Sequence, residues 1–90
     1  ATALAVHELD AQTEAAHAAV LRGEYSPLYY QMYRARHDVA SLAAAAGMWQ
    51  WQTRRHLRPD VFAKLPVRVL QQYADALNIS VEQLKTVQAA

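Results

Sequence analysis

Helix-breaking residues are rare in this chain, and each stands where a helix would begin or end. The 90 residues contain only two glycines and three prolines: Gly23, Pro27, Gly47, Pro59 and Pro66. Alanine, the best helix former, is abundant, with 19 copies, whereas there is only one isoleucine beside eight valines. Segments of helical length therefore lie between the breakers, and the chain is predicted to be all-α.

The first predicted helix runs from about Ala3 to Arg22, with Thr2 as its N-cap and Gly23 as its C′ residue. Its apolar stripe is thin and consists of Leu4, Ala5, Leu9, Ala16, Val20 and Leu21. A helix with so little apolar surface must pack on the body, pair with a second copy, or fray. We therefore divide the chain into an arm, residues 1–24, and a domain, residues 25–90.

Two further helices are predicted before Gly47. Ser26 and Pro27 are typical of an N-cap and first turn, so a helix is expected over Leu28–His37. Its inward side would carry Leu28, Met32 and Ala35, with Tyr29 and Tyr33 beside them. Asp38 then caps a helix over Val39–Ala46, whose inward residues would be Val39, Leu42, Ala43 and Ala46.

The remaining helices are predicted from the same kinds of signal, namely prolines, cap residues and apolar positions. One begins at Trp49 or Gln50 and ends near Leu57, because Pro59 disfavours the helical region just before it. A connector, Asp60–Leu65, would be held to the core by Val61, Phe62 and Leu65. Pro66 opens the next helix, whose inward side would carry Val67, Leu70, Tyr73, Ala74 and Leu77. Asn78 is expected as a left-handed C′ residue, and Ser80 caps a last helix that turns Leu84 inward.

Residues Val39–Leu57 have the pattern of a helix-turn-helix. Ala43 permits close approach of two helices, Gly47 allows the tight turn, and Met48 fills the corner. Residues 27–84 resemble the phage-repressor class of DNA-binding domain, the Cro and λ-repressor type, most strongly in the run VLQQYADALNISVEQL at 69–84. That resemblance implies a compact five-helix domain, here with an extra N-terminal helix, which binds operator DNA and often dimerises.

The chain departs from the family pattern at four positions. Trp49 stands where the family usually has a capping Ser or Thr, and Thr53 stands where it has Ile or Val. His56 replaces a commonly apolar residue, and Pro59 stands in a connector that usually holds a glycine. Helical periodicity places Trp49, Thr53 and Leu57 on one face. Because Trp49 and Trp51 alternate, we expect one of them to be in the core and the other to be exposed or to cover the connector.

The opposite face of that helix is basic and polar. Residues 54–68 have a net charge of +4, whereas residues 1–24 have a net charge of −3. Glutamine and arginine make paired hydrogen bonds to adenine and guanine in the major groove, and basic side chains neutralise phosphates. The predicted DNA-binding residues are Gln50, Trp51, Arg54, Arg55, Arg58, Lys64 and Arg68.

Other functional classes lack support in the sequence. The chain has no cysteine, and its histidines, His7, His17, His37 and His56, are not at metal-ligand spacing. No nucleophile triad, phosphate-binding glycine loop or paired carboxylates are evident, so we expect no enzyme activity, cofactor, metal or small-molecule substrate. The uncharged stretch Val39–Thr53 is too short and polar to span a bilayer, and no signal peptide is evident, so a cytoplasmic protein is expected.

Two functions of different classes remain open. The first is a sequence-selective regulator of transcription that binds double-stranded DNA through helix 49–58, as a homodimer formed through residues 1–24. The second is a protein-interaction module that keeps the helix-turn-helix scaffold without reading DNA. The unusual residues Trp49, Thr53 and His56 motivate the second, as does an amphipathic first helix that fits a partner's groove.

Overall fold

The computed structural model describes the backbone of residues 2–87 and the side chains of residues 11–87. Within these residues the chain forms seven helices and no strand, so the predicted all-α class is confirmed. The helices are α1 (Thr2–Leu21), α2 (Pro27–Arg34), α3 (Val39–Ala46), α4 (Gln50–His56), α5 (Pro59–Phe62), α6 (Val67–Leu77) and α7 (Val81–Lys85).

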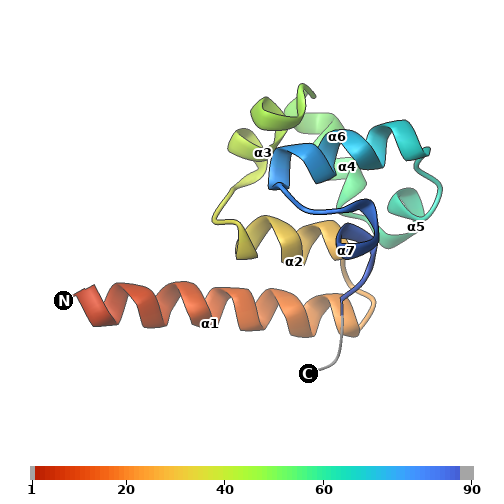
Figure 1. Ribbon diagram of the computed structural model, residues 1–90. Coiled ribbons are helices and arrows are strands. Elements are labelled where there is room, and N and C mark those ends of the chain that lie inside the picture. The colour runs from red at the N-terminus through yellow and green to blue at the C-terminus, as the bar shows by residue number, and fades with distance from the viewer. Residues whose placement is uncertain (1, 88–90) are drawn as a thin grey trace.

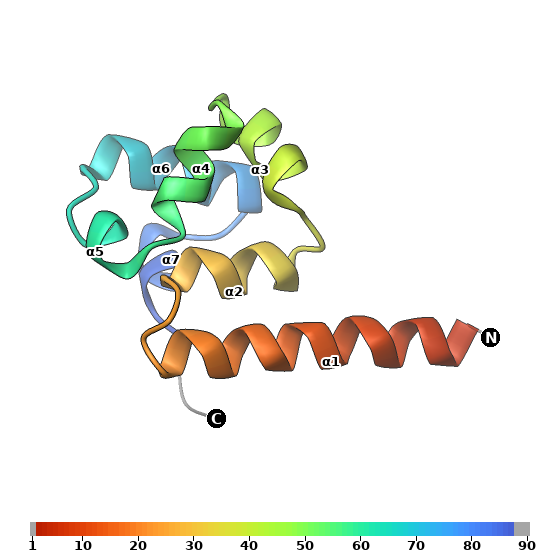
Figure 2. The ribbon, with the colours of Figure 1, turned by 180° about the vertical axis from the view of Figure 1, so that it is seen from behind.

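The helices form two levels. Helices α1 and α2 lie side by side, and α3, α4 and α6 lie on the other side of α2 (Figures 1 and 2). Helix α7 contacts both α2 and α6 and so connects the levels. The core lies between α2 and the helices α3, α4 and α6. Its fully buried side chains include Leu28, Leu42, Tyr73 and Leu84.

Left-handed residues end three helices where the sequence predicts them. Gly23 follows α1 with φ +79°, and Gly47 follows α3 with φ +71°. Asn78 follows α6 with φ +56°. At Gly47 the turn lets the Met48 N–H donate to the Ala43 carbonyl at 2.8 Å, which satisfies a carbonyl that the helix end leaves open.

The predicted caps have different outcomes. The Asp38 carboxylate accepts from the Ser41 N–H at 2.8 Å, and Ser80 Oγ accepts from the Gln83 N–H at 3.0 Å, so both caps are confirmed. Ser26 occupies the N-cap position of α2, but its side chain makes no capping bond. Its hydroxyl instead donates to the His56 carbonyl at 2.8 Å, and its N–H donates to the Leu57 carbonyl at 2.7 Å. Ser26 therefore joins the start of α2 to the end of α4.

Helix α2 is shorter than predicted, because it ends at Arg34 rather than His37. Arg36 adopts a left-handed conformation with φ +62°, which lets the His37 N–H bond to the Met32 carbonyl at 2.9 Å. Ala35 thus lies beyond the helix and is exposed, contrary to its expected inward position. The chain ends this helix without the glycine or asparagine that normally marks such a position.

Replacing Arg36 with glycine is expected to stabilise the fold by about 1 kcal/mol, because a left-handed backbone costs about that much for a residue with a Cβ. Arg36 is exposed, so the substitution removes no core contact. Urea unfolding of the two proteins measures the difference. A matched Arg34→Gly substitution inside α2 is expected to lower stability instead, and a loss in the Arg36 variant would contradict the prediction.

The buried positions on α6, α5 and α1 agree only in part with the expected ones. Val67 is 70% exposed rather than inward, because Leu70, Tyr73, Ala74 and Leu77 occupy the buried side of α6. The connector begins with a helical turn, α5, and Phe62 is buried in it as expected. On α1, Ala16 and Ala19 are buried while Leu21 is exposed. The expected inward positions Leu4, Ala5 and Leu9 lie outside the described side chains.

Candidate nucleic-acid interface

Helix α4 lies at the surface of the domain, directly after the tight turn at Gly47 (Figure 2). Trp49 is at its N-cap position with φ −76° and ψ 150°, and Trp49 makes no side-chain capping bond. Gln52 compensates in part, since its Oε1 accepts from the Trp49 N–H at 2.9 Å. Thr53 and Leu57 are buried against the domain, so the opposite side of α4 faces solvent.

The polar residues on the inner side of α4 share one partner on α6. The Tyr73 hydroxyl lies 3.1 Å from Thr53 Oγ1 and 2.6 Å from His56 Nδ1. Thr53 and Tyr73 are fully buried, and the His56 and Tyr73 rings meet edge to face. Buried polar groups are costly unless they are hydrogen-bonded. The tyrosine hydroxyl therefore explains why the chain tolerates a threonine and a histidine on the inner side of α4.

Burial lowers the pKa of His56 below its ordinary value, and the positive charge of Arg55 lowers it further. The unfolded chain therefore takes up a proton at this residue at a higher pH than the folded chain does. The contribution of neutral His56 to the free energy of unfolding is complete above the unfolded-state pKa of about 6.5. It is lost as the pH falls below that value.

We expect the free energy of unfolding to fall between about pH 7.5 and pH 5.5, by no more than about 1.4 kcal/mol per pH unit from His56. Urea unfolding at several pH values measures this slope. The variant His56→Gln is expected to flatten it, while the remaining histidines provide the same background in both proteins. An unchanged slope in the variant would contradict the assignment of this pH dependence to His56.

The outward side of α4 brings together four of the predicted DNA-binding residues. Gln50, Trp51, Arg54 and Arg55 are all exposed on this short helix. Arg54 Nη2 lies 3.5 Å from Gln50 Oε1, so these two side chains are neighbours on the surface. Helix α4 contains no acidic residue, so its exposed side presents only cationic, amide and indole groups. We call these four residues the α4 face.

Both tryptophans are exposed, which corrects the expectation that one of them would be in the core. Trp49 is 72% exposed and Trp51 is 61% exposed. Trp49 lies off the helical face assigned to it, because the N-cap backbone is extended and Thr53 and Leu57 fill the inward positions. Within the described residues neither indole contacts another ring. Helical periodicity could not identify Trp49 as a surface residue, since the repeat does not extend to a cap.

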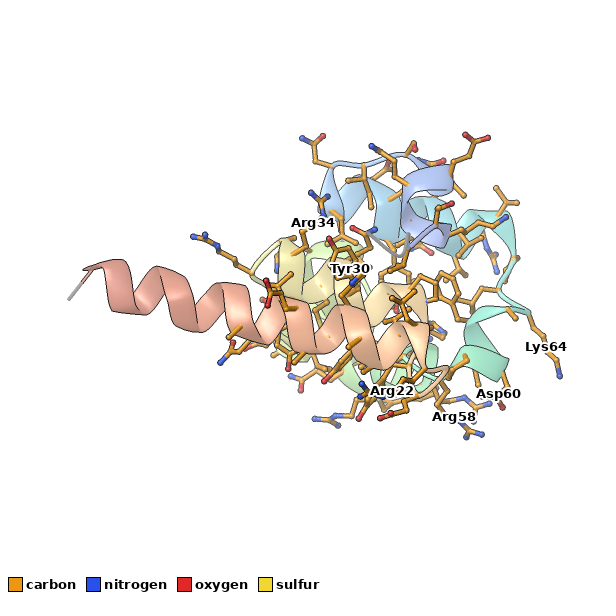
Figure 3. All side chains as sticks on the ribbon, turned by 90° about the horizontal axis from the view of Figure 1, so that it is seen from below. Arg22, Tyr30, Arg34, Arg58, Asp60 and Lys64 are labelled. Atoms are coloured by element: carbon orange, nitrogen blue, oxygen red, sulfur yellow. The ribbon has the colours of Figure 1, made fainter. Side chains whose placement is uncertain are left out.

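The other three predicted residues, Arg58, Lys64 and Arg68, lie on segments outside α4. Arg58 Nη2 donates to the Asp60 carboxylate at 3.1 Å, and both side chains are exposed. Lys64 follows α5 and points outward on the same side of the molecule as Arg58, away from Tyr30 and Arg34 (Figure 3). Arg68, on the first turn of α6, lines a shallow hollow beside the turn before α4. The structure thus brings together four of the seven predicted residues on α4, while Arg58, Lys64 and Arg68 lie on other segments.

No helix in the described part of the chain combines the length and apolar character needed to cross a bilayer. Among the described side chains, no three histidine or carboxylate groups gather as metal ligands would. Comparisons with protein-family models, with curated proteins and with solved structures found no match to this chain.

Proposed function

We propose that this chain binds double-stranded DNA, with the α4 face in the major groove, and that it regulates transcription. The observation that carries the proposal is the exposed group of Gln50, Arg54 and Arg55 on a helix without acidic residues. Arginine bonds guanine and glutamine bonds adenine in paired fashion at the groove edge. The buried contacts of Thr53 and Leu57 hold α4 on the domain, so the helix itself has a fixed orientation.

The arrangement of α3 and α4 supports the same proposal. Two short helices joined by a left-handed glycine have the connectivity of a helix-turn-helix, in which the second helix enters the groove. We propose that α2, α3, α4, α6 and α7 correspond to the five helices of the phage-repressor class, with α1 as an addition. On this view α5 is a helical turn within the connector.

Phosphate contacts would supply most of the affinity. Arg55, Lys64 and Arg68 are exposed and make no ion pair within the described residues. Arg58 is bound to Asp60 and would exchange that carboxylate for a phosphate. We further propose that two copies associate through α1 and place two α4 faces on half-sites about one helical turn apart.

Titration with random-sequence duplex DNA at about 50 and 200 mM salt tests the proposal, because released counterions make true DNA binding salt-dependent. Intrinsic tryptophan fluorescence is a suitable signal, since Trp51 lies on the α4 face. We expect binding that weakens steeply at the higher salt concentration. Absence of binding at both salt concentrations would contradict the proposed DNA binding.

A second candidate function is a protein-interaction module, and the exposure of Trp49 and Trp51 favours it. Tryptophan and arginine are enriched in the energetically dominant parts of protein interfaces. The α4 face combines both residue types. Protein binding without DNA binding in the titration would support this function in place of the first.

A further inference from the structure

We propose that Trp49 and Trp51 form a stacking platform for unpaired bases, so that the domain binds DNA with a locally opened site more tightly than perfect duplex. The inference rests on the proposed DNA-binding function and names the form of DNA that the α4 face prefers. It arises from the position of the two indoles, from the cost of placing tryptophan at a helix cap, and from the cations around them.

The two indoles lie at the end of α4 that would approach the bases first. In a helix-turn-helix complex the N-terminal residues of the second helix contact the base edges. Trp49 precedes the first residue of α4 and Trp51 is its second residue. Both are mostly exposed, and no ring of the described residues covers either indole. Most of the surface of each indole is therefore accessible to a ligand.

A second helix start in the same chain shows what tryptophan displaces at position 49. Ser80 has nearly the same backbone angles as Trp49, φ −80° and ψ 161°, and its hydroxyl accepts from the N–H of Gln83. Gln83 Oε1 accepts from the Ser80 N–H at 2.9 Å, and Gln52 Oε1 makes the equivalent bond to Trp49 at 2.9 Å. A serine at position 49 would complete this cap, which indole cannot do. Tryptophan thus gives up a favourable local bond while remaining exposed to solvent.

The charges beside the indoles favour nucleic acid as the occupant. Arg54 and Arg55 lie on the following turn of α4, and the helix has no carboxylate to oppose a phosphate. Single-stranded nucleic acid is bound in this way, by aromatic rings that stack on bases and cations that follow the backbone. Paired bases inside a duplex hide their faces from such rings. Opening a base step costs several kcal/mol in a paired duplex. At a mismatched site the bases are already unpaired, so most of that energy is not needed.

The test compares a duplex of about 30 base pairs with the same duplex carrying a short central mismatch bubble, both at low salt. We expect the unmodified chain to bind the bubble about tenfold more tightly, with quenching of tryptophan fluorescence. Trp49→Ser is expected to lose most of that preference while its thermal midpoint stays the same or rises. Val67→Ser, which removes another exposed apolar side chain, is the matched control and should keep the preference.

The possible outcomes separate this inference from the function on which it rests. Equal affinity for duplex and bubble, or a preference that survives both Trp49→Ser and Trp51→Ala, overturns the stacking platform and leaves duplex binding intact. Failure to bind either DNA overturns the proposed function, and the platform with it. Loss of the preference in Trp49→Ser, with retained affinity for perfect duplex, supports both.

Discussion

Replacing Arg54 and Arg55 together with alanine is expected to weaken binding to duplex DNA by about 100-fold, because each arginine contact contributes about 1–3 kcal/mol. Both side chains are exposed on α4, so the fold should be unaffected. If both contact phosphate, the slope of log affinity against log salt should also become shallower by about two. Fluorescence or anisotropy titration over a range of salt concentrations gives both quantities.

A charge-matched control distinguishes a local contact from the general effect of lost positive charge. Arg34 and Lys85 are exposed on α2 and α7, and Arg34 points away from the Arg58 side of the molecule (Figure 3). The variant Arg34→Ala/Lys85→Ala changes the net charge by the same amount and should keep most of the affinity. Equal losses in the two double variants would contradict a specific role for the α4 face.

Tyr73→Phe is expected to destabilise the fold by about 2 kcal/mol, although the ring and its packing are retained. The lost hydroxyl is the partner of both Thr53 Oγ1 and His56 Nδ1. Thr53 is fully buried, so water cannot easily replace that partner. Chemical denaturation measures the change, and near-ultraviolet circular dichroism reports whether the packing around the aromatic rings persists.

Adding Thr53→Val to Tyr73→Phe should recover part of the lost stability, because replacing both partners by apolar groups of similar shape leaves fewer unsatisfied atoms. The double-mutant cycle is therefore expected to show coupling of about 1 kcal/mol between the two positions. Strictly additive effects would mean that the hydroxyl pair contributes nothing, and would contradict the network described for α4 and α6.

Local signals in the sequence were enough to place most helix ends. Gly47 and Asn78 adopt the left-handed conformations expected of them, and Asp38 and Ser80 cap the helices that follow. Such signals act within a few residues and need no knowledge of tertiary structure. Arg36 carries no such signal, so the early end of α2 could not be predicted from its residue type.

The candidate site was predictable only where helical periodicity applies. The 3.6-residue repeat placed Gln50, Arg54 and Arg55 on one outward side, and the structure agrees. It misplaced Trp49, which precedes the helix and has an extended backbone. The partners of Thr53 and His56 could not be found from spacing either, because Tyr73 lies on another helix, 20 and 17 residues further along the chain.

The two hydrogen bonds that Ser26 donates to the end of α4 bear on how this helix forms during folding. With only seven residues, α4 is too short to persist as an isolated helix in water. Its final carbonyls, on His56 and Leu57, are closed by a residue about 30 positions earlier in the chain. The last turn of α4 is therefore completed by long-range docking rather than by local chain propensity. A peptide cut from this segment would not reproduce the helix, and α4 reaches its final form only as the domain itself folds.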